Sequence, residues 1–345
     1  MFQIIKGLSF MKQFTGFIKG VNLGGWLSQY PEYSEKHFNT FIQEADIQNI
    51  VKMGFDHIRI PVDYNVLETE TAEIIENGYA HLYDALAWCK KYNLKMIIDI
   101  HEVFGYSFDP LKDMDREKFF YDDMLQERFF KLWENIATRF GNESDIVAFE
   151  LLNEVVLQKV YKAWNEVAYK AIQRIRAIAP NTYIIIGGVN YNNVTSVPLL
   201  DAPYDDKIVY NFHCYEPFIF THQKAYWVAG MPSDYEIGYP AELEVYREES
   251  KPYQPESTGA IYKENITSIG PEFFEVLFED ALVTAEKYDV PLYCGEYGVI
   301  ELAPKEDTKR WLADIHSVFD KYGIGRAIWN YKNKDFGIVD SDYGF

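Results

Sequence analysis

Short apolar runs recur along the chain, and between them apolar residues return every three or four positions. The runs are nearly continuous in Val, Ile and Leu, as expected of parallel strands covered on both faces. They lie at residues 17–23, 57–62, 95–101, 146–154, 182–188, 208–215, 291–297 and 326–331. Most gaps carry amphipathic helix patterns, such as 44–54, 80–93 and 161–180. Eight strands alternating with helices predict an α/β fold, a (β/α)8 TIM barrel, as a single catalytic domain over residues 1–345.

Two irregularities modify this barrel. About 75 residues separate the sixth run from the seventh, far more than one helix needs. Residues 216–270, rich in Pro, Tyr, Glu and Ser, predict an inserted subdomain over the barrel mouth, followed by a helix at 273–289. About 14 residues follow the eighth run, too few for the usual closing helix. The N-terminal segment is a candidate to cover that side.

The net charge of -20 narrows the classes of partner. Nucleic acid and anionic membranes both need a basic surface, so neither is expected. The three cysteines fit no zinc-binding spacing and predict reduced core residues. No apolar run is long enough to span a membrane. The first 20 residues show neither a long apolar stretch nor a small-residue cleavage site, so we expect a cytoplasmic protein or a secreted one whose signal has been removed.

Polar and aromatic residues stand at the ends of the predicted strands, where the active site of such a barrel lies. They are Arg59 on the second strand, His101 on the third, Asn153 and Glu154 on the fourth, His213 and Tyr215 on the sixth, Glu296 on the seventh and Trp329 on the eighth. We therefore expect all of these side chains to face one pocket.

Two glutamates in this set, Glu154 and Glu296, are what glycoside hydrolysis requires: one acid for the leaving oxygen and one carboxylate to attack or to activate water. Arg59 would keep the nucleophile ionised, because a nearby cation lowers the pKa of a carboxyl group. Tyr215 would donate a hydrogen bond to the same carboxylate, and Asn153 would bind the sugar 2-hydroxyl. This chemistry needs no metal and no cofactor.

Several motifs resemble those of glycoside hydrolase family 5, and within it those of endoglucanase C-type cellulases. They include "GVNLGGWL" (20–27), "FELLNEVV" (149–156), "NFHCYEPFIFTHQKA" (211–225), "LYCGEYGV" (292–299) and "AIWNYKNKDFGI" (327–338). The resemblance implies a retaining endo-β-1,4-glucanase that cleaves β-glucan or cello-oligosaccharides. It assigns Glu154 as acid/base and Glu296 as nucleophile. Substrate-binding or supporting roles fall to Arg59, His101, Asn153, His213, Tyr215 and the floor residue Trp329.

The chain departs from the family pattern at Glu102, where many members have a second histidine. This change could alter the contacts near the cleaved bond. Trp227 is a candidate for a distal sugar subsite. Trp26 either lines such a subsite or packs under the N-terminal segment.

Other functions remain open at this point. Within the family, an exo-acting β-glycosidase or a hydrolase of mannan or β-1,3-glucan shares the same motifs, and the 216–270 insertion would decide between pocket and groove. A carbohydrate-binding protein without catalysis is a more remote alternative. A barrel metallohydrolase would need a His-x-His motif on the first strand, which "GVNLGG" does not provide.

Overall fold

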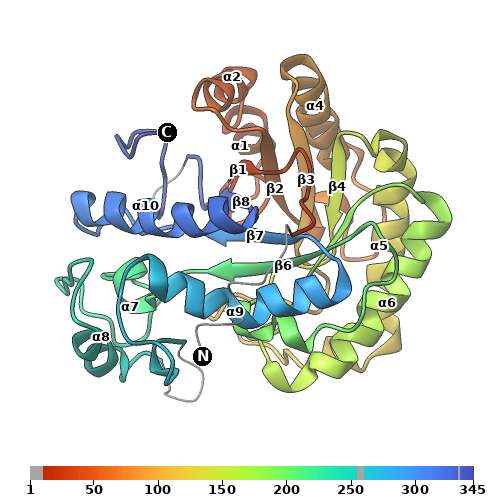
Figure 1. The fold of residues 1–345 in the computed structure, drawn as a ribbon. Helices are drawn as coiled ribbons and strands as arrows, with labels where there is room; N and C mark the ends of the chain where they lie inside the picture. The colour runs from red at the N-terminus through yellow and green to blue at the C-terminus, as the bar shows by residue number, and fades with distance from the viewer. Residues whose placement is uncertain (1–10, 255–259, 333–334) are drawn as a thin grey trace.

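Eight parallel strands close into a barrel in a computed structural model of the chain, which describes residues 11–254, 260–332 and 335–345 (Figure 1). Each strand pairs with the next in sequence, and the last pairs with the first. The strands are β1 (Lys19–Asn22), β2 (His57–Asp63), β3 (Lys95–Glu102), β4 (Val147–Glu150), β5 (Ile184–Gly187), β6 (Ile208–Cys214), β7 (Leu292–Tyr297) and β8 (Gly325–Ile328). The predicted TIM barrel is confirmed.

The fourth predicted strand was too long. Residues 146–154 were expected to form one strand, but β4 ends at Glu150. Asn153 and Glu154 therefore lie in the loop that follows. The apolar residues Leu151 and Leu152 extended the pattern past the true end, because a continuous apolar run does not mark where strand pairing stops.

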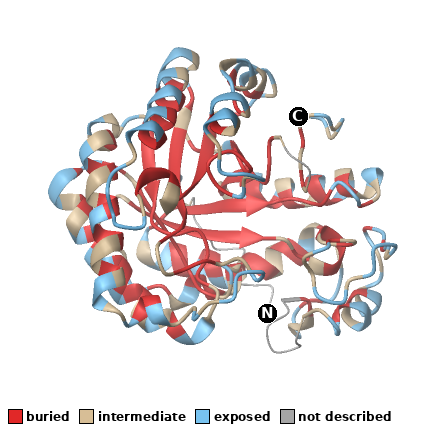
Figure 2. Ribbon diagram, turned by 180° about the vertical axis from the view of Figure 1, so that it is seen from behind, coloured by how far each residue is buried: buried red, intermediate tan, exposed pale blue. Residues whose placement is uncertain are grey.

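The long helices form the outer layer, and their buried faces turn toward the barrel (Figure 2). In α5, for example, Phe129, Trp133, Ile136 and Phe140 are buried at three- or four-residue spacing. The α-helices are α1 (Glu35–Thr40), α2 (Glu44–Lys52), α3 (Tyr64–Leu67), α4 (Glu76–Tyr92), α5 (Asp123–Phe140), α6 (Tyr161–Ile178), α7 (Phe218–Thr221), α8 (Leu243–Ser250), α9 (Pro271–Tyr288) and α10 (Lys305–Tyr322). Short 3-10 helices are η2 (Lys118–Phe120), η3 (Gly141–Glu143), η4 (Gln158–Val160), η5 (Val194–Leu199) and η6 (Ala260–Tyr262). None of the helices in the described ranges has the length and apolar character needed to cross a membrane.

Between β6 and α9 the chain forms α7, α8 and η6. This segment packs against α10, since Trp311 donates a hydrogen bond of 2.9 Å from its indole N–H to the carbonyl of Glu216. The backbone N–H of Tyr239 donates to the Asp307 carboxylate of the same helix at 2.8 Å. Residues 255–259 of the predicted 216–270 subdomain lie outside the described residues. Its status as a separate subdomain stays a prediction.

The two ends of the chain have different surroundings. Phe14 and Phe17 stack at 4.0 Å between ring centroids and pack against inward-facing residues in the first half of the strands, such as Val209 and Tyr293. Residues 11–18 therefore close the N-terminal end of the barrel. Residues 1–10, the rest of the segment expected to cover the side that lacks a helix, lie outside the described residues, so that expectation stays a prediction. No helix follows β8 within residues 329–332 and 335–345. The C-terminal Phe345 lies against Phe55 and against His316 of α10, with ring centroids at 5.5 and 6.1 Å.

Candidate active site

Arg59, a fully buried residue of β2, organises the carboxylates inside the barrel. Its guanidinium donates to both oxygens of Glu150 on β4 at 2.7 and 2.8 Å. It also lies 3.0 Å from Asp99 on β3 and 2.9 Å from Glu296 on β7. Burial raises the pKa of Asp99 and of Glu150 to about 7, while the cation opposes the shift. One cation thus joins three buried carboxyl groups from three strands.

Two asparagines extend this network. Asn22 on β1 accepts from Arg59 at 2.8 Å, and Asn153 in the loop after β4 accepts at 2.9 Å. The amide of Asn22 also donates to the carbonyl of Gly295, next to Glu296, at 2.9 Å. Asn22 was missed in the sequence, although a polar residue inside the apolar run 17–23 could have signalled it. Both asparagines fix the orientation of the guanidinium toward Glu296.

His101 is held as a neutral imidazole. Its Nδ1 donates to Asp99 at 2.6 Å, so Nε2 is the acceptor for the side-chain amide of Asn153 at 3.3 Å. This tautomer follows from the hydrogen-bond network. Burial lowers the pKa of His101 to about 3. The ring lies parallel to Trp329, with centroids 5.6 Å apart and planes 8° apart.

Glu296 is surrounded by donors that favour its ionised form. Oε1 accepts from Arg59 at 2.9 Å, and Oε2 accepts from the Tyr215 hydroxyl at 2.9 Å. Nδ1 of His213 lies 3.6 Å from Oε2. Burial raises the pKa of Glu296, whereas the positive charge of Arg59 and the bond from Tyr215 lower it.

Glu154 has different surroundings. Its Oε1 lies 2.8 Å from Nδ1 of His213. Within the described ranges it has no Lys or Arg at ion-pair distance. Burial raises the pKa of Glu154 well above its ordinary value, and the nearby charge of Glu296 raises it further. When the two carboxyl groups hold one proton, that proton therefore resides on Glu154.

The two tryptophans predicted at distal subsites have different positions. Trp26 is 1% exposed, donates from its indole N–H to the carbonyl of Phe38 at 2.8 Å and stacks near Trp88. It has no free face for a sugar, so its subsite assignment was wrong; it packs between the loop after β1 and the outer helices. Trp227 is half-buried, and its ring neighbours include Phe336 at 6.3 Å between centroids. Its role as a subsite stays a prediction.

Glu102, at the position of the departure from the family pattern, is tied to the loop after β3. Its carboxylate accepts from the Ser107 hydroxyl at 2.5 Å and pairs with Lys112. In β-sheet register it lies opposite Asp63 of β2, whose pKa is raised well above its usual range by burial and by the charge of Glu102. Glu102 therefore sits in a charged cluster beside His101 and has partners of its own.

Among the described residues, Glu154, His213 and Glu296 bring ligand-type atoms within 4.8 Å of one another. Such a group has the donor types of a divalent metal site. Both oxygens of Glu296 already accept hydrogen bonds, from Arg59 and Tyr215. The arrangement is that of a carboxyl pair joined through a histidine.

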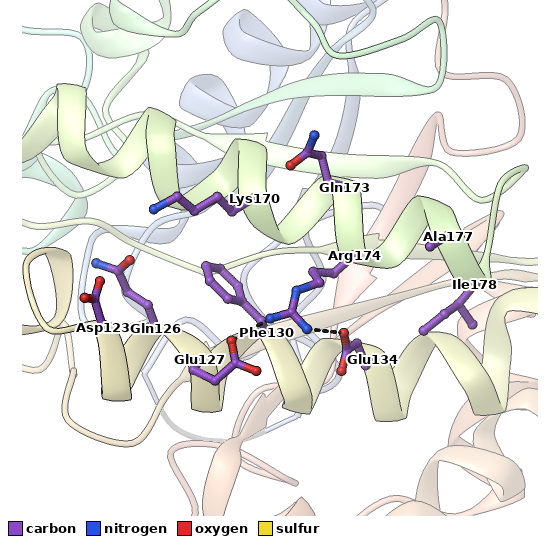
Figure 3. A pocket seen from close by; sticks show the side chains of 10 residues that line it. All are labelled: Asp123, Gln126, Glu127, Phe130, Glu134, Lys170, Gln173, Arg174, Ala177 and Ile178. Carbon is purple, nitrogen blue, oxygen red and sulfur yellow. Dashed lines mark hydrogen bonds and ion pairs between the residues drawn. The ribbon is translucent and has the colours of Figure 1, made fainter.

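A separate groove of about 520 Å³ runs between α5 and α6 on the outer layer (Figure 3). Arg174 of α6 spans it and pairs with Glu127 and Glu134 of α5 at 2.5 and 2.7 Å. These charges neutralise one another at partly exposed positions. The groove lacks the buried carboxyl pair that distinguishes the barrel mouth.

Residues 18–335 match the family model for cellulase (glycosyl hydrolase family 5). The chain is 42% identical over 317 residues to cellodextrinase A of Ruminococcus flavefaciens, covering 92% of this chain and 86% of that protein. It is 40% identical over 331 residues to endoglucanase C of Acetivibrio thermocellus, covering 95% of each. The solved structure of endoglucanase Cel5A from Thermotoga maritima aligns with a TM-score of 0.73 at 24% identity, over 94% of this chain and 93% of that one. This last likeness supports the barrel fold.

Proposed function

This chain belongs to glycosyl hydrolase family 5, and on that premise we propose that it is a retaining endo-β-1,4-glucanase with Glu296 as nucleophile and Glu154 as acid/base. Membership of this family makes it a glycoside hydrolase. The observation that supports the division of roles is the unequal environment of the two carboxyl groups. Glu296 accepts hydrogen bonds from the Arg59 guanidinium and the Tyr215 hydroxyl. Glu154 is hydrogen-bonded to the imidazole of His213.

In the first step, Glu154 gives its proton to the glycosidic oxygen while a carboxylate oxygen of Glu296 attacks the anomeric carbon. The bond from carbon to the leaving oxygen breaks, and the aglycone departs as an alcohol. The products of this step are a glycosyl ester on Glu296 and an ionised Glu154. The amide nitrogen of Asn153 carries two hydrogens, and one of them is directed to Nε2 of His101, so the other is available for the sugar 2-hydroxyl.

In the second step, Glu154 takes a proton from an incoming water as the water oxygen attacks the anomeric carbon. The ester bond breaks, Glu296 leaves as a carboxylate, and Glu154 regains its proton. Two inversions at one carbon give net retention of configuration. Arg59 and Tyr215 stabilise the carboxylate that is released.

The separation of the carboxyl groups supports retention. One carboxyl oxygen of Glu154 lies within 4.8 Å of one carboxyl oxygen of Glu296. Retaining enzymes place their carboxyl groups about 5–5.5 Å apart, and inverting enzymes leave about 6.5–9.5 Å for a water. The distance between Glu154 and Glu296 lies below the range of inverting enzymes.

The substrate class is argued from the relatives. A cellodextrinase and an endoglucanase are 40–42% identical to this chain over most of its length. We therefore assign β-1,4-linked glucan and its oligosaccharides as substrates. The enzyme should cleave internal β-1,4 linkages in both the polymer and cello-oligosaccharides.

The test combines a substrate panel with chemical rescue. Carboxymethyl-cellulose, mixed-linkage barley glucan, laminarin, glucomannan and an aryl β-cellobioside are compared for product release and loss of viscosity. We expect the fastest turnover on the β-1,4-linked glucans, with the β-anomer of the product formed first in proton NMR spectra. Turnover of laminarin alone, or first appearance of the α-anomer, would contradict the assignment.

Alanine variants separate the roles of the two carboxyl groups. Azide should restore activity to Glu154→Ala and give a β-glycosyl azide, because azide replaces water on the glycosyl-enzyme. With Glu296→Ala, azide acts in place of the nucleophile and should give the α-glycosyl azide. The reverse pattern would mean that the two residues have exchanged roles. Wild-type rates in both variants would mean that neither carboxyl group is catalytic.

A further inference from the structure

The acid/base residue Glu154 stands on a loop and not on a strand. β4 ends at Glu150, and the chain leaves the sheet before Glu154 is reached. Residues 151–155 are nevertheless buried, so their peptide groups cannot rely on bulk water for hydrogen bonds. The partners that these peptide groups find inside the protein therefore determine where the Glu154 carboxyl group lies.

The hydroxyl group of Tyr106, in the loop after β3, supplies two of these partners. It donates to the carbonyl of Glu154 at 2.7 Å and accepts from the N–H of Val156 at 2.8 Å. In a parallel sheet, a carbonyl and the N–H two residues further along point to the same side and bond to the neighbouring strand. One phenolic oxygen thus replaces that strand for the segment that carries the acid/base residue.

Tyr106 is itself held in a fixed position. The residue is 1% exposed, and its N–H and carbonyl form a pair of hydrogen bonds with Val103, at 3.0 and 3.2 Å. Its ring packs edge-on against Phe120 of η2, with centroids 5.4 Å apart. Burial raises the pKa of Tyr106, the N–H of Val156 opposes the shift, and the charge of Glu154 adds to it. The hydroxyl therefore keeps its proton at neutral pH and remains a donor.

We propose that Tyr106 is a positioning residue that aims the Glu154 carboxyl group at the leaving oxygen. Without the hydroxyl, the carbonyl of Glu154 and the N–H of Val156 lose this partner inside the protein, and a buried polar group left unpaired is costly. The peptide groups must then rotate or admit water, and the Glu154 side chain moves with them. The role of Tyr106 rests on the proposed role of Glu154 as acid/base, and it adds the residue that holds Glu154 in place.

Other backbone bonds limit how far the loop can move. The N–H of Asn153 donates to the carbonyl of Ile100 at 3.0 Å, and the carbonyl of Val155 accepts from the N–H of Tyr191 at 3.1 Å. Neither bond involves Tyr106, so the loop as a whole should stay in place when its hydroxyl is removed. We expect a small displacement of Glu154, and a misplacement of about 1 Å costs up to about 100-fold in rate.

The experiment compares two substrates that differ in their need for an acid. Phenyl β-cellobioside has a poor leaving group and needs the proton of Glu154, whereas dinitrophenyl β-cellobioside has a good one and does not. The ratio of their kcat/KM values on one preparation is independent of the folded fraction, so lost stability cannot imitate the effect. Tyr106→Phe keeps the ring and removes the hydroxyl. Tyr210→Phe is the matched control, because the buried Tyr210 donates from its hydroxyl to the carbonyl of Asp201, in the loop before β6, at 2.6 Å.

For Tyr106→Phe we expect kcat/KM to fall about tenfold with the phenyl substrate and to stay within about twofold of wild type with the dinitrophenyl substrate. Azide should raise kcat on the dinitrophenyl substrate more in this variant than in wild type, because azide attacks the glycosyl-enzyme without a base. Tyr210→Phe should keep the wild-type ratio of the two kcat/KM values. A wild-type ratio in Tyr106→Phe, or equal losses on both substrates, overturns the positioning role. Failure of the proposed function would instead appear as wild-type turnover of the phenyl substrate by Glu154→Ala.

Discussion

Tyr215 donates a hydrogen bond of 2.9 Å to Oε2 of Glu296, and Tyr215→Phe removes that bond while keeping the ring. The ring packs edge-on against His222 and Phe336, with centroids 5.1 and 5.5 Å away, so its position should survive the change. The variant therefore isolates one stabilising contact of the nucleophile.

The size of the effect follows from the charge of the acceptor. A hydrogen bond to a charged group contributes about 1.5–3 kcal/mol. One pKa unit corresponds to about 1.36 kcal/mol. Loss of the Tyr215 bond should thus raise the pKa of Glu296 by about 1–2 units, because the contact favours the ionised form.

The direction of the change in activity is then determined. The enzyme works when Glu296 is ionised and Glu154 is protonated, so the acidic limb of kcat/KM against pH reports the deprotonation of Glu296 within the coupled pair. A higher pKa of Glu296 moves this limb to higher pH by about 1–2 units. The alkaline limb, which reports Glu154, should move much less, and the active range should narrow.

The assay measures kcat/KM for an aryl β-cellobioside with a poor leaving group, so that both limbs are visible. Tyr169→Phe, on the outer face of α6, is the control for loss of a tyrosine hydroxyl. A thermal unfolding curve checks that the variant is folded. An acidic limb that stays in place in folded Tyr215→Phe would refute the argument that this bond stabilises the ionised nucleophile.

Three further changes test the fold and the site. Phe14→Ala should lower the free energy of unfolding in urea by about 3–5 kcal/mol, because it opens a cavity at the closed end of the barrel. The kcat of the folded enzyme should stay unchanged. A loss of stability below about 1 kcal/mol would contradict this prediction. Trp26→Phe should cost about 1 kcal/mol through the lost indole bond and leave KM for cello-oligosaccharides unchanged, whereas a raised KM would restore a subsite role. Arg59→Met should lower stability by about 3–5 kcal/mol, because three carboxyl groups lose their cation; an unfolding midpoint equal to that of wild type would contradict this.

The barrel and its mouth could be predicted because both depend on strands. Continuous apolar runs indicate parallel strands, and parallel strands in a barrel bring their ends together. His101, His213 and Glu296 follow from this rule, since each lies at or near the end of its strand. The structure brings them to one network with Arg59, as the positions in sequence imply.

The positions of side chains in loops could not be predicted from the sequence. Trp26 is close in sequence to β1, but the loop turns its ring into the helix layer, and a tryptophan in sequence does not reveal which way it points. Tyr191, in the loop after β5, is 44% exposed and has a left-handed backbone conformation that is disfavoured for Tyr, so local propensity does not predict its position. Phe14 and Phe17 precede the first strand, and only the closed barrel shows that they fill its N-terminal end. Tertiary packing decides these cases.

The charges inside the barrel also explain how one carboxyl group can serve as acid and then as base. Arg59 is a single cation among Asp99, Glu150 and Glu296, and Glu154 lies near them without contacting it. Burial and the negative charge of Glu296 raise the pKa of Glu154, so the free enzyme keeps a proton there for the leaving group. Once Glu296 becomes an ester its charge is gone, and the pKa of Glu154 must fall because one of the causes of its elevation has been removed. Glu154 is then the stronger acid, remains ionised until water arrives, and recovers its high pKa only when the ester breaks and Glu296 is a carboxylate again.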